Sequence, residues 1–336
     1  MSHIRSAGLR GLRATVAELG GDAERLARAA QLPVEALDRD DVLVPEQAAA
    51  TVLELAAREL DAPDLGLRIA RRQDLTMLGS LAVAIQHSPT LGDALACTSR
   101  YLFVHGRSLS LTVGPDPSGD RSSAALLYGP ATSAGPVQGT DLGVGFVHRT
   151  ITYLVGGPYG LRSVDLPYRP PAPAAAYEDF FGAPVRVGRD VPAAVLRVPR
   201  ELSQHVLTGV NDNLRLLAVA FLAEQSPGVE RRLAPRVRAV VQEALGTRPV
   251  DVGTVASLLS MHPRTLQRRL EAEGTTFGAL LDDVRRQAAL RLLTGTDLPL
   301  GQVAGMVGFA EQSALSRSAR RWWGRTPRAV RRDGAA

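Results

Sequence analysis

A weak internal repeat near the C-terminus limits what this chain can fold into more than any other feature of its sequence. The segments "VGTVASLLSM" (252–261) and "LGQVAGMVGF" (300–309) match at an offset of 48 residues, with Val255 aligned to Val303. Each copy predicts a short helix, a tight turn and a second helix, which is the layout of a helix-turn-helix. A solenoid of repeats is the alternative, but two copies are too few for one.

The second helix of the first copy has two distinct faces. At about 100° per residue, Leu266 and Leu270 define its buried side. Arg264 and Arg268 then fall on the opposite face, with Gln267 on the flank. Arginine can make a bidentate contact to guanine, and glutamine can do the same to adenine. The plainer alternative is that this face is only solvated.

The second copy predicts the same division of faces. Its inward positions are Leu315, Ala319 and Trp322, and its outward positions are Ser313, Arg317 and Arg320. Gln312 and Ser316 are expected on the flank near the start of the helix. A helix between the two copies is expected over 276–297, where apolar residues recur at helical spacing.

The distribution of charge favours nucleic-acid contact over a solvated face. From Glu230 to the end there are 18 arginines and 10 acidic residues, a net charge of +8. Residues 1–229 hold the remaining 21 arginines and 24 acidic residues, a net charge of −3, and the chain has no lysine. Both copies of the repeat therefore lie in the one strongly basic region, which suits a polyanionic partner.

The segment "GQVAGMVGFAEQSALSRSARRWWGRTPRAVRR" (301–332) resembles the signature of AraC/XylS-type transcription regulators. The positions that fit are Val303, Ala304, Gly308, Phe309, Ser313, Arg317, Gly324, Pro327 and Arg331. The aromatic residues of that signature are replaced by Leu315 and Ala319, and we expect Trp322 and Trp323 to restore the lost volume.

This resemblance implies that two recognition helices enter successive major grooves of double-stranded DNA, about 34 Å apart. It also implies roles for individual residues. The base-reading positions would be Arg264, Gln267 and Arg268 in the first helix and Gln312, Ser313 and Arg317 in the second; Arg320, Arg321 and Arg325 would contact phosphates. RNA polymerase is a further partner of such regulators, and the family leans towards activation.

The front of the chain predicts a separate α+β domain. Region 4–100 is mostly helical, and the alternating segments 108–115 and 122–130 predict a β-hairpin. Helix returns over 200–228 and ends at a Ser-Pro-Gly boundary. The expected organisation is an α+β domain over 1–225, a linker over 226–235, and an all-α domain with two helix-turn-helix motifs over 236–334.

Residues 78–199 resemble the effector domain of the ornithine-utilisation type of regulator. The matching pieces are "LGSLAVAIQHSPTLGDAL", "LPYRPPAPAAAYEDFFGAPVRV" and "VLRVPRELSQHVL". Such a domain implies a small-molecule effector and a homodimer. Candidate effector residues are His87, Arg100, Tyr101 and His105, with Tyr128 and Tyr153 as walls; each can equally be an ordinary, partly buried polar residue. The rival interpretation is an effector-independent regulator whose front domain only mediates dimerisation or protein contacts.

The sequence argues against an enzyme. Its six histidines are scattered without metal-ligand spacing, and no nucleophile elbow, P-loop or dinucleotide fingerprint is present, so no metal or cofactor is expected. The single cysteine, Cys97, lies among small and apolar residues and is expected to be buried rather than reactive. No long apolar run or signal segment stands out, so a cytoplasmic protein associated with the nucleoid is expected.

Overall fold

The computed structural model describes residues 2–129, 136–187, 193–225, 233–246, 250–259 and 261–334. These residues form two compact units, Met1–Arg215 and Leu216–Ala336. The division falls inside helix α9 (Asp212–Glu224), because Leu216 and Ala220 of this helix join the core of the second unit. Of the expected linker over 226–235, residues 226–232 lie outside the described residues.

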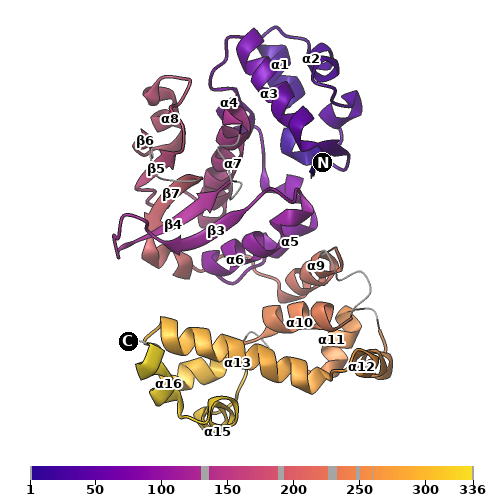
Figure 1. The fold of residues 1–336 in the computed structure, drawn as a ribbon, viewed down its shortest axis with the longest axis vertical. Helices are drawn as coiled ribbons and strands as arrows, with labels where there is room; N and C mark the ends of the chain where they lie inside the picture. Colours follow the sequence, from indigo (N-terminus) through magenta and orange to yellow (C-terminus); the bar gives the residue numbers. More distant parts are fainter. Residues whose placement is uncertain are drawn as a thin grey trace. The chain divides into compact units, whose positions relative to one another are not determined.

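The first unit starts with a short strand, continues through a group of helices and then forms a mixed sheet (Figure 1). Its helices are α1 (Leu12–Glu18), α2 (Ala23–Ala29), α3 (Glu46–Glu59), α4 (Leu65–Ala70), α5 (Ser80–Gln86), α6 (Leu91–Tyr101), α7 (Val137–Val155) and α8 (Ala174–Phe181). Its strands are β1 (His3–Arg5), β2 (Leu43–Pro45), β3 (Leu111–Pro115), β4 (Ser123–Tyr128), β5 (Ser163–Leu166), β6 (Val185–Val187) and β7 (Ala194–Pro199).

The main sheet has the strand order β3-β4-β7-β5-β6. Strands β3 and β4 pair antiparallel with Leu111 opposite Tyr128, so the predicted hairpin is confirmed. Only the pair β5 and β6 is parallel among the described strands. The small pair β1 and β2 stands apart from this sheet. The α+β class expected for the front domain is therefore confirmed.

Helix α7 is the central helix of the first unit. It follows Pro136, whose fixed φ suits a helix entry, and it ends at Gly156, which adopts a left-handed φ of 80°. On one side it contacts β4 and β7, and on the other it contacts α3 and α4. Helix α4 approaches α7 closely at Gly66, where a Cβ would lie 2.4 Å from the carbonyl oxygen of Gln138.

Every element described in the second unit after α9 is a helix. Its helices are α10 (Leu233–Ala244), α11 (Val252–Leu258), α12 (Pro263–Ala272), α13 (Phe277–Gly295), α14 (Leu300–Met306), α15 (Gln312–Trp323) and α16 (Pro327–Gly334). The pairs α11–α12 and α14–α15 are the two predicted helix-turn-helix motifs, and α13 is the predicted helix between them. The all-α class of this domain is confirmed.

Side-chain caps begin three helices of the second unit where the sequence changes from turn to helix. Asp251 accepts a hydrogen bond from the backbone N–H of Thr254 at the start of α11. The Nδ1 of His262 accepts one from the backbone N–H of Arg264 at the start of α12. Thr276 does the same for α13. Each cap satisfies a backbone donor that the first helical turn leaves free.

Each motif has its own apolar core. Leu266 and Leu270 of α12 are fully buried in the first core, and Leu315 of α15 is fully buried in the second. Trp322 and Trp323 pack against the second core, which contains the buried Leu315. Leu245 contacts both cores and links the two motifs.

Candidate nucleic-acid interface

Helix α12 presents an exposed polar face opposite its two buried leucines. Arg264, Gln267 and Arg268 are all exposed. Among the residues that the structure describes, none of the three makes a side-chain hydrogen bond or an ion pair, and Arg269 on the side of the helix makes none either. These side chains are therefore available to an external partner.

Helix α15 repeats this geometry. Gln312, Ser313, Arg317 and Arg320 are exposed, whereas Leu315 and Ala319 are fully buried. The hydroxyl of Ser313 donates to a carboxylate oxygen of Glu311 at 2.9 Å, just before the helix. Arg317 and Arg320 form no ion pair with any described residue. The base-reading positions expected from the resemblance thus lie together on one face of each helix.

Arg321 lies differently from Arg320, its neighbour. Its guanidinium forms an ion pair with Asp282 of α13, and the same carboxylate accepts a hydrogen bond from the indole Nε1 of Trp322 at 2.8 Å. This pair of contacts joins α15 to α13. Arg321 therefore supports the position of α15 against α13.

Two further arginines serve the internal architecture. Arg285 of α13 donates to the carbonyl oxygen of Gly308 at 2.8 Å, and its guanidinium lies 4.7 Å from the ring centre of Phe309. Arg331 donates to the carbonyl oxygen of Leu298 at 2.6 Å. These two arginines thus fix the second motif from inside the protein, and the exposed arginines of α12 and α15 are a distinct group.

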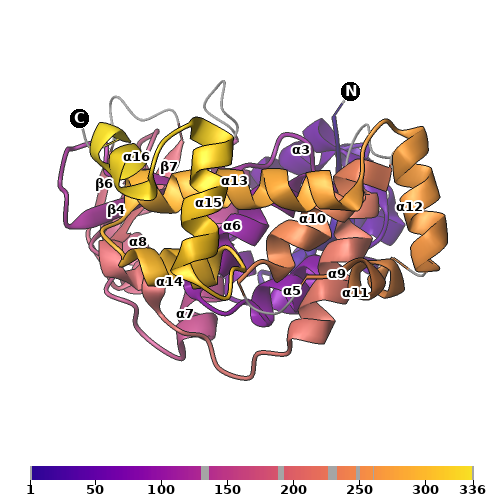
Figure 2. The same cartoon turned by 90° about the horizontal axis from the view of Figure 1, so that it is seen from below.

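The helix α13 sets the separation of the two motifs. It contains 19 residues, which corresponds to about 28 Å of rise. Figure 2 shows α12 beyond one end of α13 and α15 crossing it nearer the other end, with α12 and α15 running in about the same direction. The length of α13 is comparable to one turn of a DNA duplex, about 34 Å.

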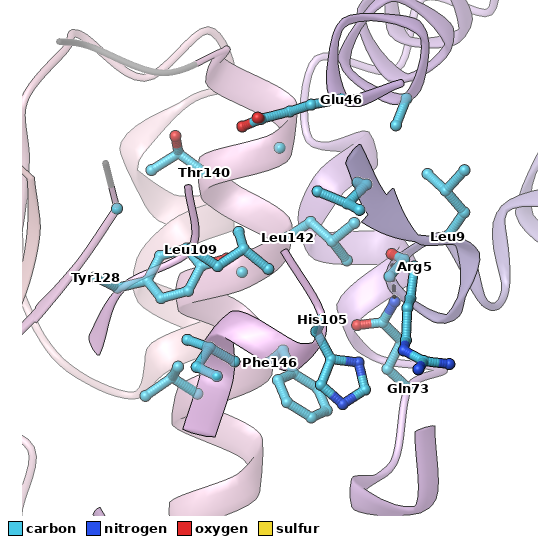
Figure 3. Close-up of a pocket in the computed structure, with 18 of the residues that line it drawn as sticks. Arg5, Leu9, Glu46, Gln73, His105, Leu109, Tyr128, Thr140, Leu142 and Phe146 are labelled. Atoms are coloured by element: carbon cyan, nitrogen blue, oxygen red, sulfur yellow. Dashed lines mark hydrogen bonds between the residues drawn. The ribbon is translucent and has the colours of Figure 1, made fainter. Parts of the chain in front are cut away.

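The first unit contains an apolar cavity of about 170 Å³. Figure 3 shows its walls coming from the N-terminal strand, α3, the end of β4 and α7. Most lining residues are aliphatic or aromatic, and the polar exceptions are Arg5, Glu46, Gln73, Thr98, His105, Tyr128 and Thr140. An apolar cavity with a few polar groups is the usual form of a small-molecule site.

The four predicted effector residues do not come together on this cavity. Only His105 lines it; its Nε2 lies 3.2 Å from the carbonyl oxygen of Leu78, and burial lowers the pKa of the ring to about 4, so it is neutral. His87 ends α5 with its Nδ1 3.2 Å from the carbonyl oxygen of Gly209. Arg100 and Tyr101 lie on α6 but do not line the cavity.

Of the two predicted walls, one lines the cavity and one does not. Tyr128 lines it, whereas Tyr153 is 65% exposed on α7. Sequence reasoning missed Gln73, Gly139 and Gly143, which also line it. Gly139 and Gly143 lie four residues apart in an apolar helix and share one face, where Gly139 leaves space and Gly143 allows the ring of Tyr128 to pack closely. This glycine spacing is the one sequence signal that indicates the position of the cavity.

Neither a metal centre nor a membrane span was found in the described part of the chain. No group of three or more His, Cys, Asp or Glu side chains there is arranged to hold a metal ion. None of the described helices is both long and apolar enough to cross a bilayer.

Family models match both units of the chain. Residues 20–205 match the arabinose-binding domain of AraC transcription regulators, and residues 255–333 match a helix-turn-helix domain. The transcriptional regulator VirS of Mycobacterium tuberculosis is 35% identical over 99% of this chain and 97% of that protein. The ornithine utilization regulator of Pseudomonas aeruginosa is 30% identical over 79% of this chain and 77% of that protein.

A solved structure shares the fold. The transcriptional regulator CdpR from Pseudomonas aeruginosa superposes with a TM-score of 0.50 at 21% identity, over 93% of this chain and 98% of that one. The relatives are regulators rather than enzymes. With two helix-turn-helix motifs on a basic unit and an arabinose-binding type of front domain, the chain belongs to the AraC family of DNA-binding transcription regulators.

Proposed function

We propose that α12 and α15 read the base sequence of two successive major grooves. The observation that supports this most directly is the exposed and unpaired set of Arg264, Gln267 and Arg268 opposite the buried leucines of α12. Gln312, Ser313 and Arg317 occupy the corresponding face of α15. Arg320 and Arg321 contact phosphates in this proposal, with Arg321 shared between Asp282 and the DNA backbone.

Replacing Arg268 by alanine is expected to weaken binding to the preferred DNA site by about 1–3 kcal/mol, because one bidentate base contact is lost. Preference should relax at one base-pair position only. A site selected by the full-length chain from a random duplex library, followed by binding measurements on all single substitutions of that site, gives both quantities.

Arg320→Ala is the matched comparison, since Arg320 is equally exposed on α15 but is proposed to contact a phosphate. It should weaken binding to all sequences alike. It should also reduce by about 1 the slope of the logarithm of the binding constant against the logarithm of the salt concentration. If Arg268→Ala also weakens all sequences alike, Arg268 does not read a base.

We also propose that the first unit binds a small-molecule effector in its cavity and that binding alters DNA affinity. The cavity of about 170 Å³ with its few polar groups supports this. Coupling between the sites requires that the effector bind the DNA-competent and DNA-incompetent states with different affinity. The rival is a regulator whose front unit mediates only dimerisation or protein contacts.

A thermal-shift screen of the full-length chain against small neutral, acidic and basic compounds tests the sensing function. A compound that raises the melting temperature is expected to change the affinity for the selected DNA site by about 5-fold or more, in either direction. Compounds that stabilise the chain but leave DNA affinity unchanged would favour the rival function.

The remaining features of this proposal follow the family. The regulator acts as a homodimer in the cytoplasm, on nucleoid DNA, and contacts RNA polymerase as an activator. Leu217 and Phe221 of α9 are 52% and 53% exposed, and such apolar side chains suit burial between subunits.

A further inference from the structure

We infer that the cavity of the first unit is built for a small uncharged molecule with an apolar body and a hydroxyl group, and that it rejects carboxylate anions. The proposal rests on the effector-sensing function proposed above and specifies its ligand class. It depends on the juxtaposition of two polar groups across an apolar space, Gln73 on one side and Tyr128 on the other (Figure 3).

The volume and the apolar walls of the cavity determine the size and polarity of the ligand that fits. Leu53, Leu102, Leu109, Leu142 and Phe146 are among its lining residues. An apolar cavity of about 150 Å³ in another protein is known to hold benzene, so about 170 Å³ suits a single ring with a short substituent. Burial of such a body in apolar walls supplies most of the binding free energy.

Gln73 presents a hydrogen-bond acceptor to this space. Its side-chain nitrogen donates to the carbonyl oxygens of Gly8 at 3.0 Å and Arg10 at 3.2 Å. Two carbonyl acceptors require the amide nitrogen on that side, so the amide orientation is fixed. Its Oε1 is buried and has no hydrogen-bond partner among the described residues, although Gln73 is only 2% exposed. A buried acceptor of this kind calls for a donor from a ligand.

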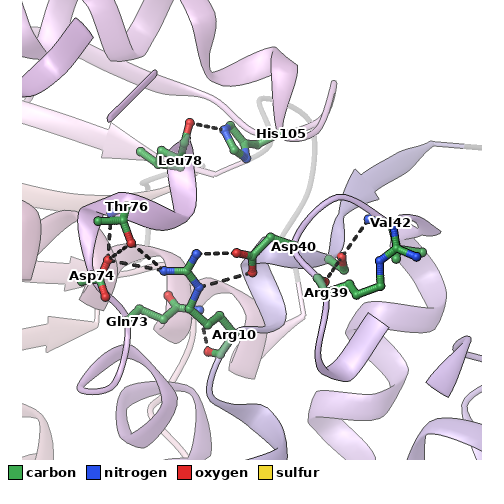
Figure 4. Close-up of polar contacts among 10 residues, drawn as sticks. Arg10, Arg39, Asp40, Val42, Gln73, Asp74, Thr76, Leu78 and His105 are labelled. Atoms are coloured by element: carbon green, nitrogen blue, oxygen red, sulfur yellow. Dashed lines mark hydrogen bonds and ion pairs between the residues drawn. The ribbon is translucent and has the colours of Figure 1, made fainter. Parts of the chain in front are cut away.

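The segment that carries Gln73 is held rigidly by a polar network (Figure 4). Arg10 pairs with Asp40 and donates to the hydroxyl of Thr76 at 2.9 Å. Asp74 accepts a hydrogen bond from the backbone N–H of Thr76 at 2.8 Å. These contacts position the Oε1 of Gln73 before any ligand arrives, which lowers the entropic cost of binding.

Tyr128 supplies the second polar group. Its ring packs against Gly143 of α7, where a Cβ would lie 2.1 Å from the phenolic oxygen. The hydroxyl makes no hydrogen bond with the described residues. Burial, together with the nearby Glu46, raises the pKa of Tyr128 to about 12, so the group is an uncharged donor and acceptor. A ligand hydroxyl can therefore meet polar partners at either end of the cavity.

The charged residues of the lining argue against an anionic ligand. The Nε of Arg5 donates to the carbonyl oxygen of Val104 at 3.1 Å, and Figure 3 shows its guanidinium directed away from Leu109 and Tyr128. Glu46 accepts a hydrogen bond from Ser108 at 2.6 Å and would repel a carboxylate. His105 is neutral because burial lowers its pKa to about 4. An unpaired anion is costly in such a site.

A matched series of single-ring probes tests the ligand class by calorimetry on the full-length chain. Benzyl alcohol is expected to bind, and benzyl methyl ether, which lacks the donor, should bind about 5- to 10-fold more weakly. Benzoate should bind at least about 100-fold more weakly, because its charge is uncompensated and Glu46 repels it. Benzylammonium, whose charge Glu46 would partly offset, should bind at least about 10-fold more weakly, because its ammonium group must still leave water. Preference for the ether or for either ion would overturn the assignment.

Gly139→Leu locates the binding in the cavity. A Cβ at Gly139 would meet only the Cγ of Pro136, at 3.4 Å, so the longer side chain can fill the space without straining the helix. We expect Gly139→Leu to weaken the binding of benzyl alcohol at least about 10-fold, whereas Gly139→Ala should change the affinity by no more than about 3-fold. Unchanged binding in Gly139→Leu would place the ligand elsewhere and overturn the proposal.

The two levels of the proposal fail in different ways. If benzoate binds best and Gly139→Leu abolishes its binding, the ligand class is wrong while sensing by this cavity stands. If no probe binds, and Gly139→Leu leaves the affinity for the selected DNA site unchanged, both the ligand class and the sensing function are overturned.

Discussion

Replacing Gly246 by alanine is expected to destabilise the second unit by about 3 kcal/mol and to weaken DNA binding by about 100-fold. Gly246 follows α10 with a left-handed φ of 80°, which costs a residue with a side chain about 1–2 kcal/mol. A Cβ there would also lie 2.3 Å from the backbone carbonyl oxygen of Met306, at the end of α14. Backbone atoms cannot yield as a flexible side chain can, so α10 and α14 must separate.

This contact matters for function because it joins the two motifs. Helix α10 packs against α12, and Met306 ends the first helix of the second motif. Displacing α14 changes the separation of α12 and α15, the helices proposed to read DNA, so both can no longer engage one duplex at full strength. Denaturant unfolding followed by tryptophan fluorescence measures the stability, since Trp322 and Trp323 are the only tryptophans of the chain.

Gly274→Ala is the matched control. Gly274 also has a left-handed φ, of 76°, but a Cβ there would meet no atom within 4 Å. It should cost about 1 kcal/mol and leave DNA affinity within about 3-fold. Equal losses of stability and affinity in the two variants would mean that the contact between Gly246 and Met306 does not hold the motifs in place.

The helix-turn-helix motifs were predictable from sequence because their signals are local. Leu266 and Leu270, spaced by one helical turn, identify the buried side of α12, and the exposed arginines follow from them. The different position of Arg321 was not predictable. Its partner Asp282 lies 39 residues away on α13, and only the packing of α15 on α13 brings the two together.

The cavity escaped prediction for the same reason. Gln73 is oriented by the carbonyl oxygens of Gly8 and Arg10, which lie more than sixty residues earlier in the chain. No periodic pattern marks such a contact. The predicted effector residues come from a single stretch of sequence, and of these His87, Arg100 and Tyr101 do not line the cavity. Residues that line a cavity are gathered by tertiary packing, and of the residues predicted from sequence only His105 and Tyr128 line this one.

A buried carboxylate on α7 gives the first unit an unusual dependence of stability on pH. Asp141 is completely buried and accepts hydrogen bonds from the hydroxyls of Tyr168 at 2.7 Å and Tyr177 at 2.5 Å. Burial raises the pKa of Asp141 from 3.8 to about 7, against the opposing effect of the two hydroxyls. The carboxyl group is therefore partly protonated near neutral pH in the folded chain.

The expected result is that the folded chain gains stability from Asp141 as the pH falls. Below the unfolded pKa of 3.8 both states hold the proton, and there is no penalty. Between 3.8 and about 7 the unfolded chain releases the proton while the folded chain keeps it, so the free energy of unfolding falls by about 1.4 kcal/mol per pH unit. Above about 7 the penalty is constant at about 4 kcal/mol.

Asp141→Asn removes this titration. The free energy of unfolding of the native chain, relative to that of the variant, should fall by about 2.5 kcal/mol from about pH 5 to about pH 8. Taking the difference in free energy of unfolding between the two proteins removes the contributions of other titrating groups. These include His105 and His148, whose pKa values burial lowers to about 4. Tyrosine absorbance follows this unit, because all six tyrosines lie between residues 101 and 177.

Asp116→Asn is the matched comparison, because Asp116 is also buried but pairs with Arg197 at 3.0 Å. Burial opposes its ionisation, yet the backbone N–H of Ser118 and the guanidinium of Arg197 together lower the pKa of Asp116. That carboxylate stays ionised in both states over the same pH range, so the difference for this variant should be flat. A flat difference for Asp141→Asn as well would show that the carboxyl of Asp141 is ionised in the folded chain, with the two tyrosine hydroxyls outweighing its burial.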